Sequence, residues 1–371
     1  MRILFITQRC GNRSGWETYS TELVHALRAK GNRVDVVSTD STADFRVSLP
    51  DPLRYKLLAL VSMPLAFCLW LRLRRKLRQY DLIHCAIEPY APFTRVLSVI
   101  MGRPYILTVH GSYGVKTLDG IFGVLQRSAY THAARIVCVS TYSQDRLTEH
   151  ISLKRSIVIP NGVTVPTDVA PSTRQPHLVF TVGAVKPRKG QHLVVEALAK
   201  VKERIPDVQY VVAGDLTSHA EYVATLRKRV AELDLGEAVV LAGRIDAQRL
   251  RDLYAKGSLF VMTPASSATD FEGFGLVYLE ANACGVPVVG MAGSGAIDAI
   301  AAGRSGLIAR EGDVADLADK ITSILLDENL RDRLAVGGLK WAYEHVWSKV
   351  IDRYIAVYAE AIGWQIDQRT D

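Results

Sequence analysis

The sequence predicts an α/β protein made of two Rossmann-like domains, each built on a parallel sheet. Residues 2–6 and 34–37 are apolar runs typical of buried strands, and an amphipathic helix pattern over about 18–30 separates them. A strand, a helix and a strand in this order indicate a parallel βαβ unit. The pattern starts again at residues 178–183, after a stretch of prolines and polar residues over 166–176 that is typical of a linker.

The composition is that of a globular protein with a large core. Of the 371 residues, 49% are hydrophobic and 22% are charged, and this length allows two domains of ordinary size. The five cysteines have no C-x-x-C or metal-binding spacing, so we expect buried, reduced thiols in a cytosolic enzyme. The chain opens on a short strand and not on a signal-peptide pattern, which favours the same location.

A histidine follows one of the first-domain strands directly. His110 and Gly111 come after the apolar run 104–109, at the carboxyl end of a strand, where open α/β sheets bind their ligands. A lone histidine is more often structural than functional. His84 lies in another strand pattern without such a glycine turn, and we assign it to the core.

The second domain opens on a basic turn. Its first strand pattern ends at Gly183, and Lys186, Arg188 and Lys189 follow within a few residues, before a helix pattern over 192–201. Three cations at the start of a helix suit a bound diphosphate. A solvated basic turn is the common alternative for such a run.

Residues 271–280 form the most informative stretch of the chain. Gly273 and Gly275 flank Phe274 directly before a run of helix formers that begins at Leu276. A glycine loop that leads into a helix leaves the first backbone N–H groups unpaired, beside the positive end of the helix dipole. The stretch therefore predicts an anion-binding site.

Two carboxylates, Glu272 and Glu280, lie eight residues apart on this loop and helix. For a ligand with a diphosphate in the middle, each carboxylate can accept hydroxyl hydrogen bonds from a sugar at one end. The alternative is a solvated loop charge and a surface helix residue. Glu280 argues against that alternative, because an unpaired charge in its largely apolar helix is unfavourable.

These residues carry a family resemblance. The pattern Glu272-x7-Glu280, with its Gly-Phe-Gly core and the continuation Glu-Ala-x-Ala-Cys-Gly-Val-Pro-Val-Val, resembles the donor-site motif of retaining GT-B glycosyltransferases of the family-4 type. The Pro-Asn-Gly-Val turn at 160–163 matches as well. The resemblance implies two Rossmann-like domains that face each other across a cleft. We expect an acceptor-binding domain over 1–165, a nucleotide-sugar-binding domain over 178–347, and a terminal helix at about 348–371 that crosses back onto the first domain.

The resemblance also implies roles for the site residues. Glu280 would hold the ribose hydroxyls, while Glu272 and the backbone of the following residues would hold the donor sugar and phosphate. His110 would lie against the donor sugar. The family's Gly-Gly pair is Ser14-Gly15 here, so only Gly15 carries over to leave room for acceptor and phosphate. We assign His110, Lys189 and Glu272 as catalytic, and as donor-binding Gly15, Gly183, Lys186, Arg188, Gly243, Arg244, Ile245, Gly273, Phe274, Gly275, Leu276 and Glu280.

The chain departs from the family at Ala184, where the pattern has an arginine. We expect Lys186 or Arg188 to supply that charge. A catalytically inactive GT-B nucleotide-sugar-binding protein and a GT-B epimerase or phosphorylase are the alternatives. An oxidoreductase is disfavoured because no G-x-G-x-x-G occurs.

The sequence also lacks the usual metal-binding motif of glycosyltransferases, because no Asp-x-Asp occurs. We therefore expect no cofactor and a metal-independent reaction. Lys189, a neighbouring cation and the helix N-terminus would stabilise the diphosphate.

Charge is unevenly distributed along the chain. Residues 1–165 hold 22 lysines and arginines against 11 aspartates and glutamates, a formal charge of +11, whereas the remainder holds 23 and 27, a charge of −4. A basic half attracts an anionic partner. No nucleic-acid-binding motif accompanies this charge, so we expect no nucleic acid as partner.

An apolar segment in the basic half favours a membrane surface. Residues 57–71 are almost all apolar and lead into the basic run 72–78, but they are fewer than the ~20 that a spanning helix needs. We expect residues 57–78 to bind the inner membrane face, which would make the protein cytoplasmic and peripheral. The alternative is a buried helix with a solvated basic end. The acceptor is then expected to be a lipid-linked sugar, as in polysaccharide or glycolipid assembly, with a soluble acceptor as the alternative.

Overall fold

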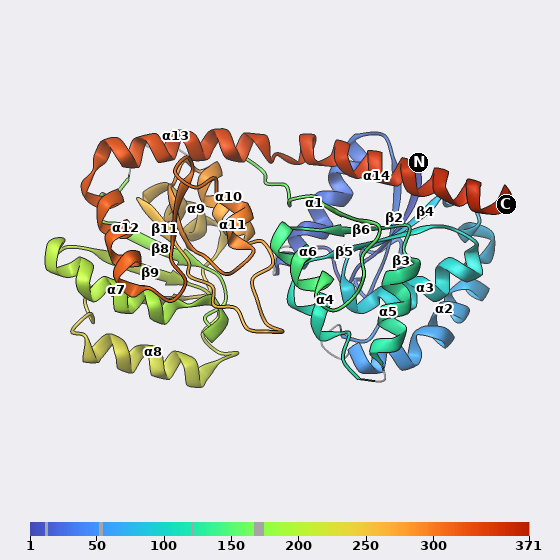
Figure 1. Ribbon diagram of the computed structural model, residues 1–371, viewed down its shortest axis with the longest axis horizontal. Helices are drawn as coiled ribbons and strands as arrows, with labels where there is room; N and C mark the ends of the chain where they lie inside the picture. The colour runs from blue at the N-terminus through green and yellow to red at the C-terminus, as the bar shows by residue number, and fades with distance from the viewer. Residues whose placement is uncertain (12–13, 52–54, 121, 167–173, 371) are drawn as a thin grey trace. The chain divides into compact units, whose positions relative to one another are not determined.

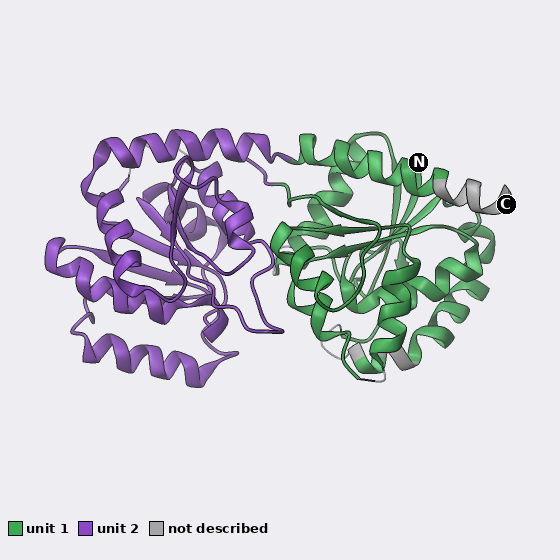
Figure 2. Ribbon diagram, viewed as in Figure 1, with its two compact units in different colours: residues 1–162, 347–371 green, residues 163–346 purple. Residues whose placement is uncertain are grey.

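A computed structural model describes residues 1–11, 14–51, 55–120, 122–166 and 174–370. The chain divides into two compact units, one of residues 1–162 and 347–371 and the other of residues 163–346 (Figure 2). Most of the expected linker, Pro171 included, lies outside the described residues.

Unit 1 is built on a parallel sheet with strand order β3-β2-β1-β4-β5-β6-β7 (Figure 1). Its central strands are buried on both faces, as the unbroken apolar runs of the sequence predict for a parallel sheet, whereas the two edge strands are partly exposed. Side chains alternate between the faces. The strands are β1 (Arg2–Ile6), β2 (Arg33–Ser38), β3 (Phe45–Arg46), β4 (Leu82–Cys85), β5 (Tyr105–Val109), β6 (Arg135–Cys138) and β7 (Ser156–Val158).

Strand β1 shows how the two faces are filled. Ile3 and Phe5 pack in a cluster with α1 (Gly15–Ala29) and α14 (Trp347–Thr370), whereas Leu4 and Ile6 belong to the cluster on the opposite face. That second cluster includes residues of α2 (Tyr55–Leu77), α3 (Ala91–Met101) and α5 (Gly123–His132). The other helical segments of unit 1 are η2 (Glu88–Tyr90), α4 (Ser112–Lys116) and α6 (Thr141–Thr148).

A buried polar network joins α14 to the sheet. His84 Nδ1 lies 2.6 Å from Tyr358 Oη, and His84 Nε2 lies 2.8 Å from Thr108 Oγ1. Tyr19 Oη lies 2.9 Å from Thr108 Oγ1 and 3.0 Å from Tyr354 Oη. The C-terminal helix is thus part of the unit 1 core, and His84 is a buried core residue.

Unit 2 repeats the architecture with a parallel sheet of order β10-β9-β8-β11-β12-β13. Its core lies between this sheet and the helices that flank it. The strands are β8 (Leu178–Val182), β9 (Gln209–Ala213), β10 (Val239–Gly243), β11 (Leu259–Val261), β12 (Val288–Met291) and β13 (Gly306–Ala309). The helices are η4 (Pro187–Lys189), α7 (Gln191–Arg204), α8 (Ala220–Glu232), α9 (Ala247–Lys256), α10 (Leu276–Ala283), α11 (Ala296–Ala299), α12 (Val314–Leu326) and α13 (Glu328–Glu344).

Each sheet has a point where the strand order reverses. In unit 1, β1 lies between β2 and β4; in unit 2, β8 lies between β9 and β11. Doubly wound sheets bind ligands at the carboxyl ends of the strands at such a point. In unit 2 the basic turn after β8 and the loop that leads to α10 after β11 both start there.

Two details differ from expectation. Helix α1 begins at Gly15, and not near residue 18, because the side chain of Ser14 caps it by accepting the N–H of Glu17 at 3.3 Å. The expectation that all thiols are buried is wrong for Cys68, which is exposed on the outward face of α2. Among the described residues, no helix has the length and apolar character needed to cross a membrane.

Candidate functional site

The basic turn after β8 is fixed against the end of β11. Gly190 adopts a left-handed φ of 71°, and a Cβ there would lie 1.8 Å from the carbonyl oxygen of Thr263. Thr263 Oγ1 donates to the carbonyl of Gly190 at 2.7 Å. Gly183, directly after β8, also has a positive φ of 142°. Only glycine fits at position 190, and this close contact positions the three cations that precede it.

The loop after β11 is held by the turn after β12. Gly295 N–H donates to the carbonyl of Glu272 at 2.8 Å, and a Cβ on Gly295 would lie 2.1 Å from the carbonyl oxygen of Gly273. Glu272 and Gly273 are therefore placed by backbone contacts, and Glu272 by its side chain as well. The Gly293-Ser294-Gly295 pattern is visible in the sequence, but its contact with Glu272 is not.

The two loops meet in a cluster of charges. Oε2 of Glu272 lies 2.5 Å from Arg188 Nη1 and 2.9 Å from Lys189 Nζ. Arg188 also donates to the carbonyl of Phe271 at 2.9 Å, and its Nε lies 3.4 Å from Asp270 Oδ1. Burial alone would raise the pKa of Glu272, but Lys189 and Arg188 outweigh it and lower that pKa to about 2. Glu272 is therefore a permanent anion that holds two cations.

Lys186 differs from the other two cations. Among the described residues its ammonium group has no hydrogen-bond or ion-pair partner, although it is partly buried. Burial lowers the pKa of Lys186 to about 8, and the positive charges of Arg188 and Lys189 act in the same direction. An ammonium group in this situation is stabilised by an anionic ligand.

The N-terminus of α10 supplies a second feature that favours an anion. Gly275 caps the helix in the left-handed conformation, with φ of 80°, and a Cβ there would lie 2.8 Å from the ring of Tyr278. The amides of Leu276 and Val277, the first two of α10, have no acceptor within the helix, and that of Tyr278 donates to the carbonyl of Gly275 at 3.0 Å. Phe274 is buried and anchors the loop beneath them.

Glu280 lies about one turn further along α10 and is partly buried. Tyr254 on α9 donates its hydroxyl hydrogen to Oε2 of Glu280 at 3.0 Å. Burial raises the pKa of Glu280, while the Tyr254 hydrogen bond lowers it. The second oxygen of this carboxylate can accept hydrogen bonds from a ligand. Sequence analysis missed Tyr254, which carries no motif.

In unit 1, His110 is held in one tautomer. Its Nε2 lies 2.8 Å from the carbonyl oxygen of Ala86, which can only accept, so Nε2 carries the proton. Its ring also meets the ring of Tyr19 edge-on, with centroids 4.4 Å apart. Burial lowers the pKa of His110 to about 4. The imidazole is therefore neutral near pH 7, with Nδ1 as a hydrogen-bond acceptor.

Comparison with known proteins decides the family. The family model described as "Glycosyl transferases group 1" matches residues 168–341, and the model described as "Glycosyltransferase Family 4" matches residues 13–165. Together the two matches span most of both units. The chain belongs to the GT-B glycosyltransferases of the family-4 type.

Similar proteins support this family assignment. The D-inositol 3-phosphate glycosyltransferase of Acidothermus cellulolyticus is 27% identical over 95% of this chain and 87% of its own. The GDP-mannose-dependent alpha-(1-6)-phosphatidylinositol monomannoside mannosyltransferase of Mycolicibacterium smegmatis is 31% identical, over 45% of this chain and 44% of its own. Among solved structures, HepE from Anabaena in complex with UDP and glucose superposes with a TM-score of 0.75 at 23% identity, covering 96% of this chain and 98% of that one. The predicted fold of two Rossmann-like domains is confirmed.

Other predicted residues of the glycosyltransferase lie apart from the charge cluster. Gly243 has a positive φ of 69°, Ile245 is partly buried, and the side chain of Arg244 is 73% exposed, with Nη2 3.7 Å from Asp215 Oδ2. They lie at the end of β10 and directly after it, and β9 separates β10 from β8 in the sheet. The structure shows no contact between them and Glu272 or Lys189. Their predicted role at the nucleobase stays a prediction.

Gly15 is not required by the packing of unit 1. A Cβ at this position would meet no atom within 4 Å, and Gly15 has no positive φ. The space next to Gly15 is therefore open within unit 1, and its use by acceptor and phosphate stays a prediction. Residues 12–13 of the same turn lie outside the described residues.

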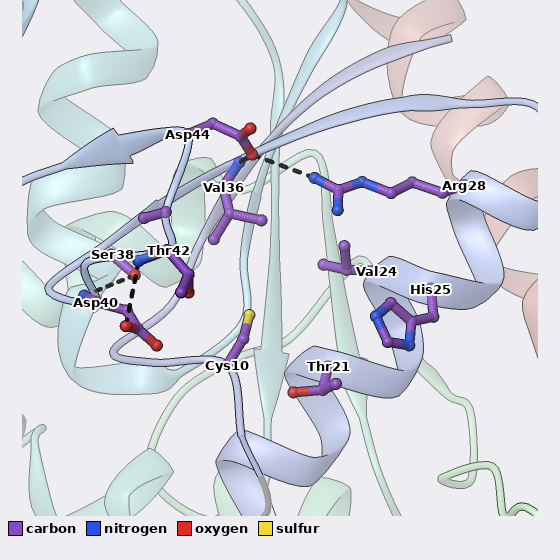
Figure 3. A pocket seen from close by; sticks show the side chains of 11 residues that line it. Cys10, Thr21, Val24, His25, Arg28, Val36, Ser38, Asp40, Thr42 and Asp44 are labelled. Carbon is purple, nitrogen blue, oxygen red and sulfur yellow. Dashed lines mark hydrogen bonds and ion pairs between the residues drawn. The ribbon is translucent and has the colours of Figure 1, made fainter.

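A polar cavity of about 250 Å³ lies beside α1, between this helix and the loop after β2 (Figure 3). Arg28 Nη2 pairs with Asp44 Oδ2 at 3.2 Å on one side, and Asp40 accepts the N–H of Thr42 on the other. Hydroxyls and carboxylates of this kind suit a polyhydroxylated ligand. The cavity is lined by Cys10, Thr21, Val24, His25, Arg28, Val36, Ser38, Asp40, Thr42, Ala43 and Asp44.

Proposed function

We propose that the protein transfers a sugar from a nucleotide diphosphate sugar to a hydroxyl acceptor, with retention at the anomeric carbon and without a metal ion. The observation that carries this proposal is Lys186, a partly buried cation without a partner among the described residues. Lys186 lies in the same basic turn as Lys189, and Lys189 contacts Glu272. Glu272 in turn lies three residues before Gly275, the N-cap of α10. A cationic turn and a helix N-terminus at one edge of a sheet suit a diphosphate.

The cations then have different tasks. Arg188 and Lys189 are already bound to Glu272, so their charge is partly neutralised before any ligand arrives. Lys186 has no ion-pair partner among the described residues, so no carboxylate in direct contact neutralises it, and it is proposed to replace the family arginine that is Ala184 here. Lys186, Lys189 and the first amides of α10 would stabilise the charge that develops on the departing diphosphate, which leaves no step that needs a metal.

The carboxylates and the histidine bind hydroxyls. Glu280, oriented by Tyr254, is proposed to accept hydrogen bonds from the ribose. Glu272 and the backbone of Gly273 are proposed to hold the donor sugar. In unit 1, the Nδ1 atom of His110 is proposed to accept a hydrogen bond from a substrate hydroxyl, because the contact of Nε2 with Ala86 leaves Nδ1 without a proton.

The names of two similar proteins support a nucleotide-sugar donor: HepE was solved with UDP and glucose, and the Mycolicibacterium enzyme is called GDP-mannose-dependent. The test is release of UDP from UDP-glucose, or GDP from GDP-mannose, in the presence of EDTA, with the sugar passing to an added hydroxyl acceptor or to water. We expect release from one donor by the wild type, at least 100-fold slower release by Lys189→Ala, and unchanged release by Lys228→Ala, a 79% exposed lysine on α8.

The same assay separates the alternatives. Binding of a nucleotide without any release would favour the inactive binding protein, and conversion of the donor to an isomer without an acceptor would favour the epimerase. Release that requires Mg²⁺ or Mn²⁺ would contradict metal independence. The anomeric configuration of the product, read by NMR, decides whether the reaction retains it.

We also propose that the acceptor is lipid-linked and that α2 binds the membrane at its inner face. Ala66, Leu69 and Leu77 of this helix face the core. The outward face is apolar as well, because Met63, Phe67 and Leu71 are 68%, 49% and 47% exposed at a four-residue spacing. A helix at an ordinary protein surface carries polar residues there.

The basic end of α2 complements this apolar stripe. Arg72, Arg74, Arg75, Lys76 and Arg78 are all exposed. Basic residues beside an apolar stripe attract anionic lipid headgroups, each by about 1 kcal/mol. The name of the Mycolicibacterium relative specifies a lipid acceptor, which supports this proposal for glycolipid or polysaccharide assembly.

Vesicle flotation tests the membrane proposal. We expect the wild type to float with vesicles of phosphatidylglycerol and phosphatidylcholine, and less with phosphatidylcholine alone. The triple variant Met63→Ser, Phe67→Ser, Leu71→Ser should bind the anionic vesicles at least tenfold more weakly, whereas Val124→Ser, at a 64% exposed valine on α5, should bind as the wild type does. Equal flotation of the triple variant would overturn this part of the proposal.

A further inference from the structure

Glu88 is a buried carboxylate that the reaction outlined above does not use. It opens η2, directly after β4, and is only 1% exposed. Its Oε1 accepts the N–H of His110 at 2.6 Å and the N–H of Gly111 at 3.1 Å. Its Oε2 is buried and has no hydrogen-bond partner among the described residues. Burying a carboxylate with one oxygen that accepts no hydrogen bond is unfavourable. Packing alone therefore does not explain why a glutamate occupies this position.

The contacts of Glu88 converge on the turn that carries His110. That turn joins β5 to α4, and Gly111 adopts φ of 148° and ψ of −127°, outside the helical region. His110 Nε2 also donates to Ala86, two residues before Glu88. Three hydrogen bonds from residues 110–111 therefore end on residues 86–88. Two of them are charge-assisted when Glu88 is ionised.

The side chain of Glu88 is not needed to hold its own segment. Gln126 Nε2 donates to the carbonyl oxygen of Glu88 at 2.8 Å, and the N–H of Tyr90 donates to the carbonyl of Ile87 at 3.2 Å. We therefore expect the backbone of η2 to stay fixed when the carboxylate is changed. The carboxylate instead holds the backbone of the turn at residues 110–111.

We propose that Glu88 is a positioning residue of this glycosyltransferase: its carboxylate holds the turn at residues 110–111 so that Nδ1 of His110 is presented to the substrate. This inference rests on the role proposed above for His110. Glu88 acts through the two amides and contacts no substrate atom itself, because both of its oxygens are buried.

The surroundings of Glu88 give the proposal a pH signature. Burial raises the pKa of Glu88 to about 7, against the opposing effect of the backbone N–H groups that it accepts. Burial also places the pKa values of Cys85 and Cys138 at about 12 and that of His110 at about 4, outside the neutral range. Three buried tyrosines on or near η2, namely Tyr90, Tyr105 on β5 and Tyr130 on α5, have pKa values raised by burial. The other ionisable side chains described on the elements packed around η2 are Tyr113 and Lys116 on α4, Arg95 on α3, and Lys56, Cys68 and the basic run 72–76 on α2.

The experiment follows the backbone amide of His110 directly. In protein labelled with ¹⁵N-histidine, the resonance of His110, identified by its absence in His110→Gln, is recorded from pH 5 to 9. We expect it to titrate with a midpoint near 7 in the wild type and in Glu149→Gln, an exposed glutamate of the same unit. In Glu88→Gln the titration should be lost, because the amide oxygen accepts the same hydrogen bonds without ionising.

Turnover provides the second measurement. With the donor that the wild type uses, the rate constant kcat should fall below pH 7 in the wild type and in Glu149→Gln but not in Glu88→Gln. Glu88→Ala, assayed below its melting temperature, should lose at least tenfold in kcat at pH 8, with the affinity for nucleoside diphosphate within twofold of the wild type. Glu88→Gln should recover most of that loss.

A wild-type His110 amide that does not titrate near pH 7, or a Glu88→Gln variant that keeps the acidic fall in kcat, would overturn the positioning role. Absence of turnover by the wild type itself would speak against the proposed function instead. The NMR titration distinguishes the two cases, since it reports on the contact between Glu88 and His110 without substrate.

Discussion

Lys189 Nζ lies 2.9 Å from Oε2 of Glu272, and this contact joins the loop after β8 to the loop after β11. The two side chains are 13% and 12% exposed. Arg188 uses the same carboxylate oxygen, so one carboxylate orders two of the three cations in the basic turn. Glu272 is therefore a structural anion of the site as well as a predicted sugar ligand.

Replacing Glu272 by glutamine should have opposite effects on stability and on nucleotide binding. Loss of the anion leaves Lys189 without its ion-pair partner and leaves Arg188 with only Asp270 and the carbonyl of Phe271. We expect this loss to lower the free energy of unfolding by roughly 2–3 kcal/mol. The same change frees both cations for a diphosphate, so affinity for the matching nucleoside diphosphate should be maintained or increased. Urea denaturation and calorimetric titration measure the two quantities, and weaker nucleotide binding by this variant would contradict the structural role.

The contact also predicts a pH dependence of stability. Because the pKa of Glu272 is about 2 in the folded protein and about 4.5 in the unfolded chain, its stabilising effect is complete above pH 4.5 and is lost as the pH falls towards 2. The melting temperature of the wild type should therefore fall more steeply with acid below pH 4.5 than that of Glu272→Gln. Parallel curves for the two proteins would show that the ion pairs do not stabilise the fold.

Lys186→Ala should weaken nucleotide binding without destabilising the protein. The ammonium group has no partner among the described residues and lies near two other cations, so its removal relieves repulsion. Loss of one charged contact to a diphosphate should weaken binding about 10- to 100-fold. Lys228→Ala is the matched control on the exposed face of α8. Wild-type affinity in Lys186→Ala would leave Arg188 as the replacement for the family arginine.

Tyr254→Phe tests the orientation of Glu280. The variant removes the hydrogen bond of 3.0 Å to Oε2 and should lower the free energy of unfolding by about 1 kcal/mol. If Glu280 holds the ribose, nucleoside diphosphate affinity should fall several-fold in this variant and further in Glu280→Gln. Tyr222→Phe, at a partly buried tyrosine of α8, should leave that affinity unchanged. If nucleotide affinity falls in Glu280→Gln but not in Tyr254→Phe, Tyr254 does not orient Glu280 for binding.

The buried network around His84 makes a prediction about unit 1. Burial, and after it His110, lowers the pKa of His84 to about 3, compared with about 6.5 in an unfolded chain. The neutral form is therefore favoured by folding, and its contribution to stability is complete above pH 6.5 and is lost as the pH falls towards 3. Tyr358→Phe leaves His84 Nδ1 without a partner and should lower the free energy of unfolding by about 1–3 kcal/mol.

Circular dichroism melts of Tyr358→Phe, with Tyr343→Phe as a control at a 54% exposed tyrosine, measure that effect. A stability loss equal in both variants would mean that α14 is held by apolar packing alone.

Much of the fold follows from local sequence patterns. The strand of residues 2–6 and the Gly-Phe-Gly turn into α10 are predictable because periodicity and glycine placement act over a few residues. The partners of the site residues are not predictable in this way. Tyr254 meets Glu280 across two helices, α9 and α10, that are separated in the chain by β11. Glu88 meets His110 because the neighbouring parallel strands β4 and β5 bring their carboxyl ends to one edge of the sheet.

The departure from the family at Ala184 is a second case in which the sequence alone does not identify the contacts of a side chain. From the sequence, Lys186 and Arg188 were equal candidates to replace the missing arginine. The structure separates them, because Arg188 is bound to Glu272, Asp270 and the carbonyl of Phe271, while Lys186 has no partner among the described residues. Ion pairs depend on side-chain geometry across two loops, and residue spacing does not report it.

The most direct test of the donor site is a thermal-shift measurement with UDP, GDP, ADP and dTDP in EDTA, on the wild type, Lys189→Ala and Glu280→Ala. At 100 times its dissociation constant, a bound nucleotide adds about 2.7 kcal/mol of stability. We predict that one nucleotide raises the melting temperature of the wild type and that both variants lose this increase. If no nucleotide stabilises the wild type, with or without added metal, the donor site described in unit 2 is contradicted.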